Sequence, residues 1–294
     1  MKLVTYLAAQ GPRPGFIQGD WVVDLPEFWR AAGINYPLPE DLLAILAQGP
    51  GLLKKLADLA ADDLPPRFTR VPLAQARLKA PLPKPGKIIG AARNYHDWLV
   101  QAGMQAPQEP ILFAKTPNTV IGPGEAIVLS DLSRQVSYEA EVAVVIGSAG
   151  RNISPHKAMS CVAGYTIIND VSAVDLIKRD GNMFRGKNLD TFAPLGPALV
   201  TADEVPDPHR LSIRLSMNGK ILQDSSSAQM VMKIPELISF ISRDFTLEPG
   251  DVIASGTPGG TAGFHNPPAF LMPGSELEIS IAGLGVLRNP VVKN

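Results

Sequence analysis

The sequence predicts an α+β protein that is rich in β-strands, because short apolar segments of strand composition outnumber helical patterns. The 294 residues include 26 glycines and 28 prolines, which are spread along the chain rather than clustered. This spread indicates many turns between short strands rather than disorder. A hydrophobic content of 45% is sufficient for a large core. We therefore expect one large domain, alone or with a small one.

The first 75 residues predict a small α+β domain at the N-terminus. Strands are expected at Lys2–Leu7 and Phe16–Val23, with a hairpin turn at Gly19-Asp20. Leucines and isoleucines at helical spacing follow on both sides of the break at Gly49–Gly51. This apolar stripe is most simply a packing face.

A proline-rich segment over residues 76–86 is expected to separate this domain from the rest of the chain. Pro81, Pro83 and Pro85 stand at alternate positions. Proline is excluded from a central strand and from a helix interior, because it lacks the backbone N–H. The segment is therefore predicted to be a stiff linker, with a second and larger domain over residues 87–294.

The second domain is dominated by strand signals and is predicted to be a β-rich roll or sandwich. One helix is expected near Pro235, with an apolar face that extends from Ile234 to Phe245. Asn218-Gly219 marks a hairpin. The expected strands are Lys87–Ala91, Ile111–Lys115, Ala126–Leu129, Tyr138–Ile146, Gly164–Asn169, Leu211–Met217, Asp251–Ser255 and Glu276–Ile281.

The overall charge and the single cysteine limit the classes of function. A net charge of −1 and a pI near 6.4, with no basic stripe, give no support for nucleic-acid binding. No uncharged apolar run approaches the roughly 20 residues of a membrane span, and no signal peptide is expected. Cys161 is predicted to be a small buried residue, and one cysteine cannot form an internal disulfide. A reducing cytoplasm is therefore expected.

The strand at Tyr138–Ile146 carries two acids on one face. Glu139 and Glu141 alternate with apolar residues, so their positions lie roughly 6.5–7 Å apart along the strand. If that face met solvent, Ala143 and Val145 would be exposed beside them. If it lines a cleft, the two carboxylates need a counter-charge.

A third acid ends the next expected strand. Asp170 follows the apolar run from Gly164 to Asn169 and is able to meet the glutamate pair. Three carboxylates without cysteine or histidine form an all-oxygen site, which suits Mg²⁺, Mn²⁺ or Ca²⁺ better than zinc. The alternative is an exposed polar strand face with an aspartate in a turn, and the residue types alone leave both open.

Two further segments are candidates for binding anions. Lys187 ends a loop with two cations and two glycines, where it would stabilise an oxyanion or hold a substrate carboxylate, although such a lysine is more often solvated. Gly256 and Thr257 follow an apolar strand in a turn of small residues that lets an anion approach backbone N–H groups. A plain tight turn explains the second pattern equally well.

The order of these pieces resembles the catalytic domain of the fumarylacetoacetate hydrolase family. The resemblance covers the chain from Lys87 to the C-terminus, about 70% of its length. No single motif is specific, but the combination is. The matching segments are Ala92–Tyr95, Tyr138–Glu141, Gly164–Asp170, Arg185–Lys187, Asp190–Pro197 and Gly256–Pro258.

The resemblance implies a fold and a set of ligands. It implies a mixed β-sandwich roll, usually a homodimer, with Mg²⁺ or Mn²⁺ held by Glu139, Glu141 and Asp170; Ca²⁺ is also compatible. It further implies that Arg93 and Thr257 contact the substrate. Gly256 belongs with Thr257 in this predicted binding turn.

The same resemblance implies an enzyme that acts on a small 2-oxo or β-dicarbonyl acid. Family members hydrolyse β-diketo acids, decarboxylate or tautomerise 2-oxo acids, or dehydrate sugar acids. Such an acid chelates the ion through its carboxylate and keto oxygens, and the ion stabilises an enolate when a neighbouring C–C or C–H bond breaks. Lys187 is the expected catalytic residue, because it would share that negative charge.

Departures from the family pattern bear on the reaction. Family hydrolases carry a His-Glu pair three and six residues past Tyr95, where this chain has Trp98 and Gln101. Neither side chain is a general base. Val174 and Ile177 stand where relatives often have arginine and glutamine. Decarboxylation or keto–enol tautomerisation is therefore favoured over hydrolysis.

Two alternatives to this reading stay open. One is a C–C hydrolase of the acylpyruvate or fumarylacetoacetate type, and the other is a metal-containing relative that binds a small acid with little turnover. In relatives the segment equivalent to Tyr95–Gln108 forms a lid. Here we expect Trp98 and Gln101 to belong to that lid, with Trp98 closing over the substrate.

Overall fold

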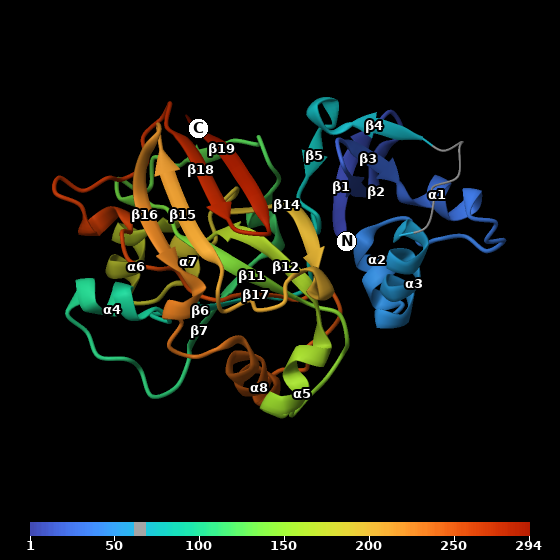
Figure 1. The fold of residues 1–294 in the computed structure, drawn as a ribbon. Coiled ribbons are helices and arrows are strands. Elements are labelled where there is room, and N and C mark those ends of the chain that lie inside the picture. Colours follow the sequence, from blue (N-terminus) through green and yellow to red (C-terminus); the bar gives the residue numbers. More distant parts are fainter. Residues whose placement is uncertain (62–68) are drawn as a thin grey trace.

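The computed structural model describes residues 1–61 and 69–294 and consists mainly of two β-sheets with helices at their edges (Figure 1). The predicted strand-rich α+β class is confirmed. The large sheet has, in spatial order, β4 (Arg70–Pro72), β3 (Trp21–Asp24), β2 (Gly11–Gln18), β1 (Lys2–Ala8), β14 (Ala193–Thr201), β12 (Val162–Asn169), β11 (Ala140–Ile146), β17 (Val252–Ala254), β6 (Ile88–Ala92) and β7 (Ile111–Lys115), with β5 (Leu78–Lys79) beside β1 and β8 (Val120–Ile121) beside β14.

A smaller sheet packs on one face of the large one. Its order is β16 (Lys220–Ser226), β15 (Ser212–Met217), β18 (Glu276–Ile281), β19 (Gly285–Lys293) and β9 (Ile127–Leu129), and β10 (Val136–Ser137) pairs separately with β13 (Ser172–Ala173). The α-helices are α1 (Leu25–Ala31), α2 (Leu42–Ala47), α3 (Pro50–Ala61), α4 (His96–Ala102), α5 (Pro155–Ala158), α6 (Val174–Asp180), α7 (Phe184–Lys187) and α8 (Ile234–Asp244).

The central strand β11 is buried on both faces, which explains the unbroken apolar run from Val142 to Ile146. Val142 and Val144 point into a core shared with the small sheet. Ala143 and Val145 point into a second core, shared with the helices of the N-terminal region. Glu139 and Glu141 have the same parity as Ala143, so they lie on the face of the second core, at the end of the strand.

The N-terminal region is joined to the large sheet rather than standing beside it. Strand β1 pairs with β14, with Leu3 opposite Leu199. Strand β5 lies inside the predicted linker and pairs with β1, and Ala80 and Leu82 are buried. The boundaries at residues 75 and 86 stay a prediction, but hydrogen bonding and packing continue across them.

Both hairpins expected from the sequence are present. Gln18 pairs with Trp21 around Gly19-Asp20. Met217 pairs with Lys220 around Asn218-Gly219. Asn218 and Gly219 have φ values of 53° and 79°, the left-handed pair that a tight two-residue hairpin requires. Turn chemistry is a local property, which is why the sequence alone located these corners.

Several elements differ from the sequence expectation. Helices α4, α5, α6 and α7 accompany the single helix predicted for this region, and strands β14 and β19, which both contain prolines, were not predicted. Phe245 does not extend the apolar face of α8: it caps the helix in an extended conformation and is 48% exposed. Cys161 is only partly buried, in a 3₁₀ turn before β12.

The described helices include none that is long and apolar enough to cross a bilayer.

Candidate metal centre and active site

The pairing of β11 with β12 brings the three predicted acids together. Ala140 lies opposite Asn169, so Glu139 and Asp170 sit just beyond the paired ends of the two strands. The Asp170 backbone N–H donates to the Glu139 carbonyl at 2.9 Å, and the Glu139 N–H donates to Asn169 Oδ1 at 2.9 Å. One carboxylate oxygen from each of Glu139, Glu141 and Asp170 lies within 4.8 Å of the others.

Two lysines supply the counter-charge that this cluster needs. Lys187 Nζ donates to Glu139 Oε2 at 2.8 Å and also to Asp170 Oδ2. Lys115 Nζ lies 2.8 Å from Asp170 Oδ1, and both of these side chains are fully buried. The sequence analysis did not single out Lys115. The available signal was a lysine that ends an apolar strand, where no solvent balances its charge.

Electrostatics in the cluster divide the acids into two kinds. Burial, reinforced by the charges of Asp170 and Glu139, raises the pKa of Glu141 well above its usual value, and burial raises the pKa of Glu139 as well. Burial acts in the same direction on Asp170, but the charges of Lys115 and Lys187 outweigh it and lower the pKa of that carboxyl. The cluster therefore holds more carboxylate than its two lysines stabilise.

The donor set fits a hard divalent cation. The three candidate groups are all carboxylates, the ligand type that Mg²⁺ and Mn²⁺ prefer. Among the described residues, Asp170 Oδ1 accepts no hydrogen bond, although it forms the ion pair with Lys115. The Lys115 ammonium meets this oxygen, and with Lys187 it leaves one of the three buried carboxylates without a counter-charge. A divalent ion beside these oxygens would remove the surplus negative charge.

The predicted turn at Gly256 and Thr257 lies directly behind Glu141. The Gly256 N–H donates to Glu141 Oε2 at 2.8 Å. Thr257 Oγ1 donates to the Ala140 carbonyl at 3.1 Å and accepts from Gln223 Nε2 at 3.0 Å. Gly256 has φ +97°, and an added Cβ would meet the Ala91 carbonyl oxygen at 2.9 Å. In this structure the turn orients Glu141, and its contact with substrate stays a prediction.

Arg93 lines a cavity of about 560 Å³ next to the cluster. It has φ 58°, a left-handed conformation that is costly for a residue with a side chain and recurs at functional sites. Lys178 lines the same cavity, and within residues 1–61 and 69–294 neither cation has an ion pair or hydrogen bond. Phe113 also lines it, and the Phe113 ring centroid lies 4.8 Å from Lys187 Nζ.

Trp98 and Gln101 share one face of α4. The Trp98 ring packs edge-on against Phe264, with centroids 5.5 Å apart. Gln101 Oε1 accepts from the Gly260 N–H at 2.7 Å. The helix ends at Gly103, whose φ of 63° caps it. Helix α4 thus docks on the loop that follows Thr257, while closure of the segment as a lid stays a prediction.

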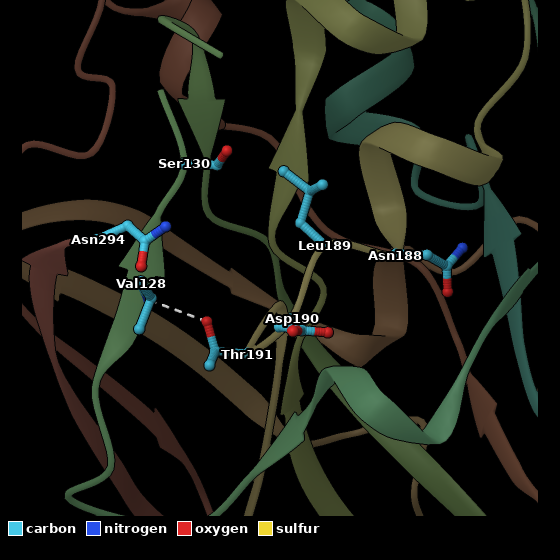
Figure 2. A pocket seen from close by; sticks show the side chains of 7 residues that line it. All are labelled: Val128, Ser130, Asn188, Leu189, Asp190, Thr191 and Asn294. Carbon is cyan, nitrogen blue, oxygen red and sulfur yellow. Dashed lines mark hydrogen bonds between the residues drawn. The ribbon is translucent and has the colours of Figure 1, made fainter. Parts of the chain in front are cut away.

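A second cavity, of about 500 Å³, is lined by the segment that directly follows Lys187 (Figure 2). Asn188, Leu189, Asp190 and Thr191 form one side of it, and Val128 contributes from β9. The Thr191 hydroxyl accepts from the Val128 N–H at 2.8 Å. Thr191 has φ 70°, which is unusual for a β-branched residue. This contact ties the chain after Lys187 to the small sheet.

Comparison with known proteins identifies the same part of the chain. Residues 87–292 match the family described as fumarylacetoacetate (FAA) hydrolase, C-terminal. The chain is 39% identical over 297 residues to the mitochondrial oxaloacetate tautomerase Fahd2a of Rattus norvegicus, covering 99% of this chain and 92% of that protein. It is 39% identical over 283 residues to the oxaloacetate tautomerase YisK of Bacillus subtilis, covering 94% of each.

Solved structures share the fold over the whole chain. Fumarylacetoacetate hydrolase from Exiguobacterium antarcticum has a TM-score of 0.85 at 33% identity, with full coverage of both chains. Maleylpyruvate hydrolase from Sphingobium sp. SYK-6, in complex with manganese(II) ion and pyruvate, has a TM-score of 0.80 at 30% identity, again with full coverage of both. The buried acidic cluster and these matches agree with the fold and family expected from the sequence. The chain is therefore an enzyme of the fumarylacetoacetate hydrolase family.

Proposed function

We propose that this enzyme interconverts the keto and enol forms of a small 2-oxo dicarboxylic acid, with oxaloacetate as the substrate. The observation that carries the proposal is the position of Lys187, whose ammonium contacts Glu139 and Asp170 inside the acidic cluster. There it would face the negative charge that develops on the keto oxygen of an oxo-acid bound at the cluster. The two oxaloacetate tautomerases that match nearly the whole chain support this choice of substrate.

Mg²⁺ or Mn²⁺ held by Glu139, Glu141 and Asp170 would supply a Lewis acid that polarises the keto group. Lys187 stays protonated there: burial opposes its charge, but the neighbouring carboxylates outweigh burial and raise the pKa of the ammonium. Two of its three N–H groups donate to Glu139 and Asp170, which leaves one as a donor to the substrate. In the tautomerisation one proton passes from carbon 3 to solvent water and one proton passes from solvent water to the oxygen of carbon 2, so the step is balanced and needs no oxidant or reductant.

The neighbouring cavity accounts for a second carboxylate on the substrate. Arg93 and Lys178 line it without anionic partners among the described residues. Two such cations favour an anionic group, and the apolar residues Ile177 and Met183 beside them exclude part of the water. A dicarboxylic oxo-acid would place one carboxylate near the acidic cluster and the other in this cavity.

The replacement of the His-Glu pair supports isomerisation over hydrolysis. Trp98 packs on Phe264, and Gln101 accepts a hydrogen bond from Gly260. Neither side chain is able to take a proton from water. Tautomerisation needs no attacking water, whereas C–C hydrolysis does. Hydrolysis of acylpyruvates, decarboxylation, and binding of a small acid with little turnover are therefore the alternatives to tautomerisation.

The proposal is tested by following the ultraviolet absorbance of the oxaloacetate enol with the chelator-treated protein, before and after addition of Mg²⁺ or Mn²⁺. The same protein is assayed for CO₂ release and for acylpyruvate hydrolysis. We expect metal-dependent acceleration of enol–keto exchange and weak or absent hydrolysis. Hydrolysis at ordinary enzyme rates with no effect on the enol signal would assign the hydrolase function instead.

The setting of the enzyme is a proposal as well. We propose a homodimer in the cytoplasm, supported by the family resemblance and by the single cysteine. Light scattering of the purified protein tests the dimer, and fractionation of cells that make it tests the compartment. A monomeric mass, or recovery of the protein in an organelle or outside the cell, would contradict these proposals.

A further inference from the structure

Asn188, the residue after Lys187, makes four side-chain hydrogen bonds to two separate segments. Oδ1 accepts from the Thr116 backbone N–H at 2.6 Å and from the Thr116 hydroxyl at 3.0 Å. Nδ2 donates to the Ala114 carbonyl at 2.9 Å and to the Phe184 carbonyl at 2.7 Å. A side-chain amide offers two donors and two acceptor lone pairs, so the hydrogen-bonding capacity of Asn188 is filled.

These partners enclose both lysines of the acidic cluster. Ala114 and Thr116 flank Lys115 on β7, and Phe184 begins the helix that ends at Lys187. Lys115 Nζ also donates to the Lys187 carbonyl, so the two segments are joined a second time. The backbone around Lys115 and the backbone around Lys187 are therefore hydrogen-bonded to each other.

Figure 2 shows the Asn188 side chain directed away from Asp190 and Thr191. Although Asn188 lines the cavity of about 500 Å³, its amide is fully used by Ala114, Thr116 and Phe184. The Asn188 amide therefore offers no free donor or acceptor to a ligand in that cavity. The amide instead connects the two segments that carry Lys115 and Lys187.

We propose that Asn188 is a positioning residue that sets the two ammonium groups of Lys115 and Lys187 against the acidic cluster. It acts through these lysines and does not touch the substrate. Lysine side chains are long and flexible, so their amino groups are placed accurately only if the backbone that carries them is fixed. A misplacement of about 1 Å in a catalytic group costs roughly 10²-fold in rate.

Two variants remove the tie in different ways. Asn188→Ala deletes all four hydrogen bonds. Asn188→Asp keeps the shape and the acceptors but turns an oxygen towards the Ala114 and Phe184 carbonyls, in place of the donor. Asn35→Ala is the control, because Asn35 is an exposed amide of the N-terminal region, between α1 and α2, with no side-chain hydrogen bond to the described residues. If Asn188→Asp does not fold, Asn188→Ala alone tests the proposal.

The kinetic experiment measures kcat and KM for oxaloacetate, with kcat expressed per bound Mn²⁺. We expect kcat per ion to fall about 10- to 100-fold in both Asn188 variants, with KM changed less than about threefold, and the Asn35 control to stay within about twofold of wild type. A purely structural role would reduce folded protein and bound Mn²⁺ but leave kcat per ion unchanged. That result would overturn the proposal.

The catalytic readout rests on the proposed function, so a second arm uses no substrate. Amide hydrogen exchange of the metal-free protein should accelerate together at residues 112–116 and 184–188 in Asn188→Ala, and at neither in Asn35→Ala. Acceleration in only one segment, or in neither, means that Asn188 does not join them, and the proposal is then wrong. A wild type without tautomerase activity refutes the proposed function alone, and the exchange result still decides the role of Asn188.

Discussion

Two groups of buried acids in this protein have opposite charge balances. In the N-terminal region, the Asp24 carboxylate accepts from Arg13 Nε at 2.5 Å, Arg13 Nη2 at 2.7 Å, the Tyr6 hydroxyl at 2.7 Å and the Glu27 N–H at 2.9 Å. One negative charge meets one positive charge, and both oxygens have hydrogen bonds. Such an arrangement stabilises a fold without calling for a ligand.

The cluster at the end of β11 and β12 has three carboxylates against two lysines, and Asp170 Oδ1 accepts no hydrogen bond among the described residues. Burial raises the pKa of Glu141, whereas at Asp24 the hydrogen bonds from Arg13, Tyr6 and Glu27 outweigh burial and lower the pKa. The difference teaches that burial of an acid is not informative by itself. Unbalanced charge distinguishes a candidate ligand site from a structural one.

The largest expected effect comes from Glu141→Gln. Loss of the ion's stabilisation of the enolate should lower kcat by about 10³-fold or more, because such stabilisation is worth several kcal/mol. The metal-free variant should melt no lower than the wild type, since one repelling charge is gone. Calorimetry with and without Mn²⁺ checks this: Mn²⁺ should raise the midpoint of the wild type but not of the variant. Glu278→Gln, an exposed glutamate, is the control, and an active Glu141→Gln variant would contradict the ligand assignment.

The second effect is the reverse, a loss of stability without a loss of turnover. Asp24→Asn should lower the free energy of unfolding by about 2 kcal/mol, because Arg13 loses its partner but keeps some solvent contact. Denaturant titration measures the free energy, and kcat at 25 °C should match the wild type. Asp20→Asn, in the neighbouring turn, serves as control. A large fall in kcat would mean that the two acid groups are not separate in function.

The third prediction concerns acid. Because the folded-state pKa of Asp24 lies below its value in the unfolded chain, its stabilisation is present above the unfolded pKa of about 4 and is lost as pH falls through the folded value. The difference of about 2 kcal/mol between wild type and Asp24→Asn should therefore hold at neutral pH and shrink below about pH 4. Denaturant titrations across this range test it. A difference that stays constant down to pH 2 would show that folding does not lower the pKa of Asp24.

The smallest expected effect tests the cavity beside the acidic cluster. Lys178→Ala should raise KM for oxaloacetate about fivefold with little change in kcat, since an exposed charge contact contributes about 1 kcal/mol to binding. KM for pyruvate, which lacks the second carboxylate, should not change. Arg179→Ala, on the same helix but outside the cavity lining, is the control. Equal effects of Lys178→Ala on the KM of both acids would contradict the assignment of this cavity to the second carboxylate.

Local patterns predicted much of this molecule. The alternation of Glu139 and Glu141 on an apolar strand, with Asp170 at the end of the next strand, pointed to one cluster, and the structure brings the three together. The turn pairs at residues 19–20 and 218–219 were equally readable. Strands β14 and β19 were not, because Pro194 and Pro290 argue against a strand, and pairing with neighbours distant in sequence overrides that local preference.

The sequence by itself determined the family, the oxygen-ligand chemistry and the departure at Trp98 and Gln101, because these depend on residue type and spacing. Only the tertiary structure decided that Lys115 reaches Asp170, 55 residues away, and that Asn188 binds both sides of Lys115. It also decided that the turn at Gly256 holds Glu141. The physical reason is that the energetic effect of a charged side chain depends on its partner and its solvent exposure. Both are set only when distant segments pack together.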